Sequence, residues 1–262
     1  MNGRSSAIDA LILAGSRGPH DPIAALGNVA HKALTPIAGR PMLAFVLDAI
    51  RAVPEVERIF ICIDADTDLR PVTNGTPFTR IAPAASPAAS VVAALDVIDG
   101  DRPLLVTTAD HPLLTPAMIR HFLDHAPADA DLCVGLAEAA VITAAFPEGR
   151  RTFYRLGGSG YSGCNLFLAR RPGAARVADY WRRMESHRKN PLRMVREIGL
   201  GALFRYALGR LSLQAAFRHV SSKAGAVIQP VLMPFAEAAT DVDKPADYEL
   251  VSRILSARTG RA

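Results

Sequence analysis

The 262-residue chain alternates short apolar runs with segments in which apolar positions recur every three or four residues. Apolar runs of strand length stand at 8–14, 58–64, 104–106, 132–136, 165–169 and 226–232. Helical spacing of apolar residues is found at 43–50, 91–98 and 250–254. Glycine, proline and small polar residues fill many of the connections, as is typical of turns and loops. This alternation predicts an α/β domain with a mostly parallel sheet.

The segment 172–222 departs from this rhythm and is predicted to be a helical insertion within a single domain spanning 1–262. Its long apolar stretches are interrupted by Arg193, Arg196, Arg205, Arg210 and Arg218. These arginines can reach water from helices that pack on the sheet. They can also form an amphipathic surface for peripheral contact with anionic lipid or with a lipid-like phosphorylated acceptor. Nucleic acid is not expected as a partner, because aliphatic rather than stacking aromatic residues separate the arginines.

Composition adds a bias toward anionic partners and does not indicate the oligomeric state. Half of the residues are hydrophobic, the formal net charge is +5 and the pI is about 9.4, which favours an anionic partner. No apolar stretch approaches the roughly twenty residues that cross a bilayer, so we expect a cytoplasmic location. The three cysteines lack CxxC spacing and are predicted to be buried thiols rather than disulfide or zinc ligands.

The first candidate site follows the apolar run 8–14. Gly15 and Gly18 permit positive φ and let backbone N–H groups approach a polyanion. Arg17 and Lys32 can neutralise phosphate charge. A tight turn with two solvated cations is the competing interpretation. The sequence contains neither the Gly-Lys-Ser/Thr of a Walker A loop nor the third glycine of a dinucleotide fingerprint at this point.

Acidic residues mark two further candidate positions. Asp110 follows the apolar run 104–106, where a strand's carboxyl end could present it to Mg²⁺, although such residues often only cap helices or shape turns. Asp241 and Asp243 precede Pro245, which can begin the last helix. Carboxylates at that place can equally stabilise a helix N-terminus.

Two loops complete the set of candidates. Ser86 and Ser90 precede or begin the helical run 91–98 and can serve as N-terminal caps. The glycine-rich stretch 157–163 lies beside Arg150, Arg151 and Arg155 and leads into a strand predicted to begin at Asn165. We predict either a mobile hairpin loop with a basic flank or a loop that lies over a substrate.

Together, the stretches LILAGSRG, HKALTPIAGRPML, TTADHPLL and ATDVDKPADYEL resemble the motifs of nucleotidyltransferases with a GT-A-like Rossmann fold. This group includes molybdenum cofactor guanylyltransferase and the sugar-1-phosphate and alcohol-phosphate nucleotidyltransferases. Their loop often reads Gly-x-Gly-x-Arg, whereas this chain has GSRGPHDP, and Lys244 stands where the family has Thr before the last helix. The resemblance implies a three-layer, mostly parallel α/β fold.

The resemblance also implies roles for the candidate residues. Lys32 and Arg17 would hold the triphosphate, while Asp110 and Asp243 would bind Mg²⁺, with Asp241 as the substitute for Asp243. The nucleotide would contact Leu13, Ala14, Gly15, Ser16, Gly18, Ser86 and Ser90. The acceptor would contact Arg155, Gly163 and Asn165.

The function implied is transfer of a nucleotidyl group from an NTP to a phosphorylated small-molecule acceptor, with release of pyrophosphate. The basic and apolar insertion suggests an acceptor on the way to a lipid or cell-envelope component and gives CTP a small preference as the donor. One alternative is a GT-A glycosyltransferase. Such an enzyme would need an Asp-x-Asp metal-binding motif in the middle of the chain, whereas TTADHP contains one Asp. The other is a non-catalytic protein that binds nucleotide or a membrane surface.

Overall fold

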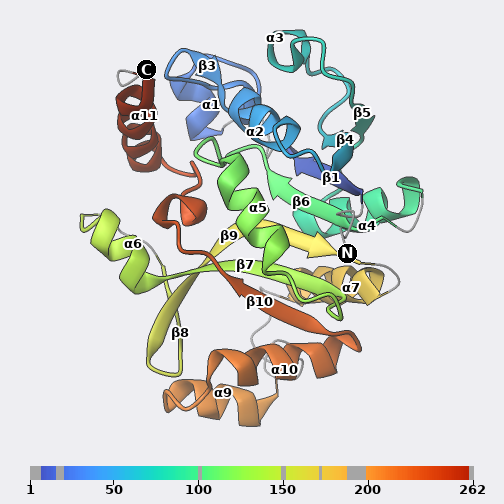
Figure 1. The fold of residues 1–262 in the computed structure, drawn as a ribbon, viewed down its shortest axis with the longest axis vertical. Coiled ribbons are helices and arrows are strands. Elements are labelled where there is room, and N and C mark those ends of the chain that lie inside the picture. Colours follow the sequence, from blue (N-terminus) through green and yellow to red (C-terminus); the bar gives the residue numbers. More distant parts are fainter. Residues whose placement is uncertain are drawn as a thin grey trace, which may run out of the picture.

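A central eight-stranded sheet organises the protein in the computed structural model (Figure 1), which describes residues 7–15, 21–99, 102–148, 152–170, 173–187 and 199–259. Its strands are β1 (Ile8–Leu13), β4 (Val56–Cys62), β5 (Thr79–Ile81), β6 (Leu104–Thr108), β7 (Leu132–Glu138), β8 (Tyr154–Leu156), β9 (Ser159–Ala169) and β10 (Ile228–Leu232). The order is β10-β7-β9-β6-β1-β4-β5, and β8 pairs with β9. Two short strands, β2 (Pro36–Ile37) and β3 (Arg40–Pro41), form a separate hairpin.

Most neighbouring strands run parallel, as predicted. The exception is β9, which lies between β6 and β7 and is antiparallel to both, and also to β8. Parallel pairs join β1 to β4 and β6, β4 to β5, and β7 to β10. The carboxyl ends of β1, β4 and β6 therefore meet at one edge of the sheet.

The described helices are α1 (Pro22–Leu26), α2 (Met42–Arg51), α3 (Arg70–Thr73), α4 (Pro87–Val97), α5 (Pro116–Asp124), α6 (Ala139–Ala145), α7 (Gly173–His187), α9 (Leu200–Ala207), α10 (Leu213–Ala224) and α11 (Pro245–Thr259). Short 3₁₀ turns are η1 (Lys32–Leu34) and η2 (Ala236–Ala239). Helices α1, α4, α5 and α10 each begin after a residue whose side chain caps the N-terminus. At α5, for example, Pro116 follows Thr115, whose Oγ1 accepts a hydrogen bond from the Met118 N–H at 3.3 Å. Proline in the first turn and threonine at the cap both favour a helix start.

Alternating side chains of β1 divide the core into two layers of helices. Ala10 and Ile12 belong to a buried cluster with residues of α2, α5 and α6. Leu11 belongs to another with residues of α4 and α7, so the sheet is covered on both faces (Figure 1). Such a buried parallel strand needs apolar residues on both sides. The predicted three-layer α/β fold with a mostly parallel sheet is confirmed.

The described part of 172–222 is largely helical. Helix α7 packs on the same face as α4, with Ala174 and Ala178 in the shared cluster, while α10 packs beside β10 through Ala224 and Ile228. Residues 188–198, which include Arg193 and Arg196, lie outside the described residues. Among the helices that the structure describes, none is both long and apolar enough to cross a membrane.

The start of strand β9 differs from the prediction. We predicted a loop over 157–163 and a strand that begins at Asn165, but β9 begins at Ser159 and pairs with β8 and β7. Only Gly157 and Gly158, both with positive φ, form the turn of the hairpin that joins β8 to β9. A Cβ at Gly160 would lie 2.9 Å from the Ala139 Cβ, a distance that forces something to move. Gly160 therefore permits close packing of a strand.

Phe122 tests the packing of α5 on the sheet. Its side chain is fully buried, so Phe122→Ala should leave a cavity and lower the free energy of unfolding by about 3–5 kcal/mol. Urea unfolding measures this change. Leu200→Ala removes an exposed side chain and should change the free energy by less than about 0.5 kcal/mol. Equal midpoints for Phe122→Ala and the wild type would contradict the packing.

Candidate functional site

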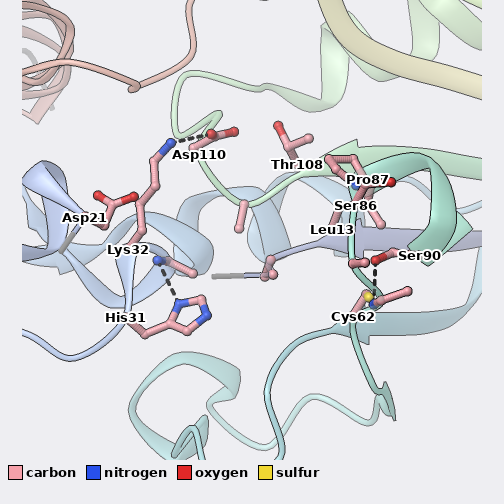
Figure 2. Close-up of a pocket in the computed structure, with 16 residues that line it drawn as sticks. Leu13, Asp21, His31, Lys32, Cys62, Ser86, Pro87, Ser90, Thr108 and Asp110 are labelled. Atoms are coloured by element: carbon pink, nitrogen blue, oxygen red, sulfur yellow. Dashed lines mark hydrogen bonds and ion pairs between the residues drawn. The ribbon is translucent and has the colours of Figure 1, made fainter. Parts of the chain in front are cut away.

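A cleft of about 520 Å³ opens at the sheet edge where β1, β4 and β6 end (Figure 2). Open α/β sheets bind ligands at such edges. The residues that line it are Leu13, Ala14, Gly15, Asp21, His31, Lys32, Ala33, Cys62, Ala84, Ala85, Ser86, Pro87, Ser90, Thr108, Ala109 and Asp110. The cleft therefore gathers the loop after β1, the η1 turn, the loop before α4 and the end of β6.

The η1 turn fixes the backbone that carries Lys32. The Nδ1 atom of His31 accepts a hydrogen bond from the Ala33 N–H at 3.1 Å, which caps the turn. On the other side, the Thr35 hydroxyl donates to the Ile23 carbonyl at 3.2 Å, and the Met42 N–H donates to the Thr35 carbonyl at 3.0 Å. The lysine side chain consequently starts from a rigid support.

Two carboxylates distant in sequence hold the Lys32 ammonium group. Its Nζ lies 2.7 Å from Oδ2 of Asp110 and 2.7 Å from Oδ1 of Asp243. The Val242 N–H donates to the Asp110 carbonyl at 2.9 Å, which joins the two acidic segments. Burial alone would lower the pKa of Lys32, but the two carboxylates outweigh it and raise the pKa above its ordinary value. Lys32 is a largely buried cation, 13% exposed, shared by two anions.

The same carboxylates fit a metal that arrives with a ligand. Oδ1 of Asp110 is buried and has no hydrogen-bond partner among the described residues. The described residues include no group of three or more His, Cys, Asp and Glu side chains that could hold a metal ion. Mg²⁺ commonly takes only one or two protein carboxylates and completes its shell with phosphate oxygens and water. Asp110 and Asp243 suit that arrangement better than a metal cage built only of protein.

The first loop lies at the cleft as the sequence predicted, as far as it is described. Leu13, Ala14 and Gly15 line the cleft. A Cβ at Gly15 would lie 3.3 Å from the Cβ of Pro83, so glycine lets the loop pass close to the segment before α4. Ser16, Arg17 and Gly18 lie outside the described residues, and their predicted roles remain predictions.

Ser86 and Ser90 also line the cleft, but their hydroxyls accept hydrogen bonds from the backbone. Ser86 caps α4 by accepting from the Ala89 N–H at 3.2 Å. Ser90 accepts from the Ala84 N–H at 2.9 Å. Both serines shape the loop 82–86 that borders the cleft. Direct contact of either hydroxyl with a nucleotide remains a prediction.

The predicted acceptor residues lie on β8 and β9, outside the described cleft lining. Asn165 has a φ of 50° and donates from Nδ2 to Oδ2 of Asp241 at 3.3 Å. This contact brings Asn165 to the segment that carries Asp243. Gly163 has open space where a side chain would be, and Arg155 is exposed on β8. Thus Asn165 is brought toward the acidic segment, and Arg155 stays on the exposed hairpin.

The sequence analysis missed a polar pair beside the lysine. His31 is buried in the cleft wall, and its Nε2 lies 3.4 Å from Oδ2 of Asp64. Burial lowers the pKa of His31, although Asp64 acts in the opposite direction. A signal was present, because Asp64 ends the apolar run 58–64 and so reaches the same sheet edge as the other candidates.

A mostly parallel α/β sheet, with a largely buried cation and two carboxylates gathered at its carboxyl edge, defines the class of NTP-binding transferases with a Rossmann-like fold. Residues 10–157 match the family described as the MobA-like NTP transferase domain. The match covers more than half of the chain, and the chain belongs to this family. The nucleotidyltransferase resemblance expected from the sequence is confirmed, and nucleotidyl transfer is the general activity of the class.

Solved structures agree with this assignment. A hypothetical transferase from Thermus thermophilus is 28% identical, with a TM-score of 0.78, and the match covers 92% of this chain and 99% of that one. Two others show the shared fold. The 4-diphosphocytidyl-2C-methyl-D-erythritol synthase from Anaerococcus prevotii is 10% identical, with a TM-score of 0.59 and coverage of 96% and 99%. The 2-C-methyl-D-erythritol 4-phosphate cytidylyltransferase from Thermus thermophilus is 14% identical, with a TM-score of 0.56 and coverage of 95% and 99%. No curated protein matches at a significant level.

His31 provides a test by pH. Because burial lowers its pKa below the ordinary 6.5, the neutral side chain contributes stability above that pH, and this contribution is lost as the pH falls through the folded-state pKa. His31→Asn keeps an acceptor for the Ala33 N–H but does not titrate. From about pH 7.5 to about pH 5.5, the wild type should lose more unfolding free energy than the variant, by at most about 1.4 kcal/mol per pH unit. Urea unfolding at each pH gives this free energy. If it fell by the same amount in the wild type and in His31→Asn, a buried neutral His31 would be contradicted.

Proposed function

We propose that the protein transfers a nucleotidyl group from an NTP to a phosphorylated small-molecule acceptor and releases pyrophosphate. The observation that carries this proposal is the convergence of Lys32, Asp110 and Asp243 at the cleft, with both carboxylates 2.7 Å from the ammonium. A cation for the triphosphate and carboxylates for its counter-ion are the parts that phosphoryl chemistry requires of a protein. Membership of the NTP transferase family supports the same reaction.

In the proposed reaction, an oxygen of the acceptor phosphate attacks the α-phosphorus of the NTP. A new P–O bond forms, the bond from the α-phosphorus to the bridging oxygen breaks, and pyrophosphate leaves with that electron pair. The acceptor phosphate is already ionised near neutral pH, so the protein need not supply a general base. Its task is to align the two substrates and to neutralise their charge.

The chain's own residues divide this task. Lys32 would exchange a carboxylate contact for the triphosphate when nucleotide binds, and the backbone at Gly15 would approach the phosphates. Arg17 is proposed as a second cation on the same loop. Asp110 and Asp243 would hold Mg²⁺, which neutralises phosphate charge when bound. Asp241 would keep its hydrogen bond with Asn165 and would not bind the metal.

The substrates are proposed on narrower grounds. Two solved structures of the same fold are named for cytidylyl chemistry, which supports CTP as the first donor to test. Asn165 and Gly163 are proposed acceptor contacts because β9 brings Asn165 to the acidic segment 241–243. Arg155, exposed on β8, would meet an anionic acceptor from the outer side.

Pyrophosphate release tests the proposal directly. Each NTP, with Mg²⁺, is paired with a panel of phosphorylated alcohols and sugars, and one pair should support release. Lys32→Met, Asp110→Asn and Asp243→Asn should each lower the rate by about 100-fold or more, because each removes a charge that would hold the triphosphate or its metal ion. Asp48→Asn is the matched control. Asp48 is half-exposed and pairs with Arg40 on α2's surface, so its loss should leave the rate unchanged.

Other products would assign other functions. Release of a nucleoside diphosphate in place of pyrophosphate would indicate glycosyl transfer. Nucleotide binding that depends on Lys32, with no release from any pair, would indicate a non-catalytic nucleotide-binding protein.

A further inference from the structure

Helix α9 turns its apolar residues to solvent. Leu200 and Phe204 are 75% and 67% exposed, and Leu208, at the helix C-cap, is 50% exposed. No residue of α9 is buried. Because the three side chains are four residues apart, they lie on one face of the helix. Single exposed apolar residues are ordinary on a protein surface, but several on one face indicate a site that contacts another molecule or a membrane.

From α9 to the end of β10, the charged side chains of the chain are all basic. Residues 198–236 contain no Asp or Glu, and their cations are Arg205, Arg210, Arg218 and Lys223. All four cations are exposed. The nearest acidic residue along the chain, Glu197, precedes the helix by three residues. An apolar helix face with exposed basic residues beside it is the pattern of a helix that lies in the headgroup region of a bilayer.

The helices around α9 place this face at the periphery of the molecule. Helix α10 is anchored to the sheet, with Leu213 packed beside Leu136 and Tyr161 and Ala224 beside Val177. Helix α9 lies with α10 at the end of the molecule opposite α11, as Figure 1 shows. A flat surface could therefore approach α9 from outside without displacing the sheet.

We propose that Leu200, Phe204, Leu208, Arg205 and Arg210, here named the α9 surface, dock the protein reversibly on an anionic phospholipid bilayer. The apolar side chains enter the headgroup boundary, and the two arginines contact lipid phosphates. This docking goes beyond nucleotidyl transfer and does not depend on it. One short helix buries too little apolar area for permanent attachment, so anionic lipid is required.

Other occupants fit the surface less well. A second copy of the chain would bring cations of the same sign together, which disfavours association. Nucleic acid would satisfy the arginines but leave Leu200 and Phe204 in water. An anionic bilayer satisfies both the apolar residues and the charge.

Sedimentation with lipid vesicles tests the docking on the full chain. At about 0.05 M salt, the protein should bind vesicles of phosphatidylcholine with about one third phosphatidylglycerol, and binding should weaken at least tenfold by about 0.5 M salt. Vesicles of phosphatidylcholine alone should bind it poorly. The pair of changes Arg205→Gln and Arg210→Gln should weaken binding to anionic vesicles by about 25-fold, or about fivefold for each arginine.

The apolar part of the surface has its own variant and controls. Leu200→Ser with Phe204→Ser should weaken binding by about tenfold or more. Val97→Ser removes an apolar side chain that is 58% exposed on α4, and Arg253→Gln removes an exposed cation on α11. Both controls should bind as the wild type does.

Three results would overturn the docking. The wild type could show no preference for anionic vesicles, or the α9 variants could bind vesicles as well as the wild type does. The third result is a wild-type dimer in sedimentation that the serine substitutions dissociate, with no protein bound to vesicles. Pyrophosphate release without vesicles is measured on the same proteins and should be equal in the wild type and the α9 variants. Failure of pyrophosphate release in every protein would refute the proposed function and leave the vesicle result to be judged separately.

Discussion

One largely buried ammonium group, that of Lys32, determines how the functional end of this protein is assembled. Removing a lysine charge from water costs several kcal/mol unless anions compensate it, and Lys32 finds two carboxylates at 2.7 Å. Asp110 is 78 residues away in the sequence and Asp243 is 211 residues away. The η1 turn, the end of β6 and the segment before α11 must therefore meet at one point. The raised pKa of Lys32 follows from this meeting.

The sheet makes this meeting possible with little distortion of the chain. Parallel pairing of β1 with β4 and β6 brings three strand ends to one edge, and each ends in a loop that contributes to the cleft or its wall. The antiparallel strand β9 adds Asn165, which joins Asp241 in the segment before α11. The charged residues of the site thus lie in short turns and loops that border rigid elements, which favours a preorganised arrangement of charge.

Local sequence predicted the elements well and the contacts between them poorly. Apolar runs and helix caps, such as Ser86 before Pro87, indicated the strands and helices because those signals act over a few residues. The glycines of 157–163 predict one long loop, but only Gly157 and Gly158 form a turn, with positive φ, whereas Gly160 permits close packing of β9 beside Ala139. A glycine that permits a turn and one that permits close packing look alike in a sequence.

The site could be predicted in its members but not in its geometry. Their places beside apolar runs and helix starts make Lys32, Asp110 and Asp243 candidates, and resemblance to a family implies their roles, but no pattern in the chain shows that one ammonium joins both carboxylates. The pair His31 and Asp64 was missed because each side chain gains its role from a partner far away in sequence. Likewise, helical spacing in α9 predicts an apolar face, but only the packed structure shows that Phe204 on this face is exposed.

The central claim is that Lys32 binds the triphosphate while Asp110 and Asp243 bind its metal ion. A crystal structure with a non-hydrolysable CTP analogue and Mn²⁺ tests it most directly, because anomalous scattering locates the ion. The account predicts the triphosphate in the described cleft with Lys32 Nζ on a phosphate oxygen and the ion on Asp110 and Asp243. An ion bound away from both carboxylates, or a nucleotide that leaves the Lys32 ion pairs untouched, would contradict it.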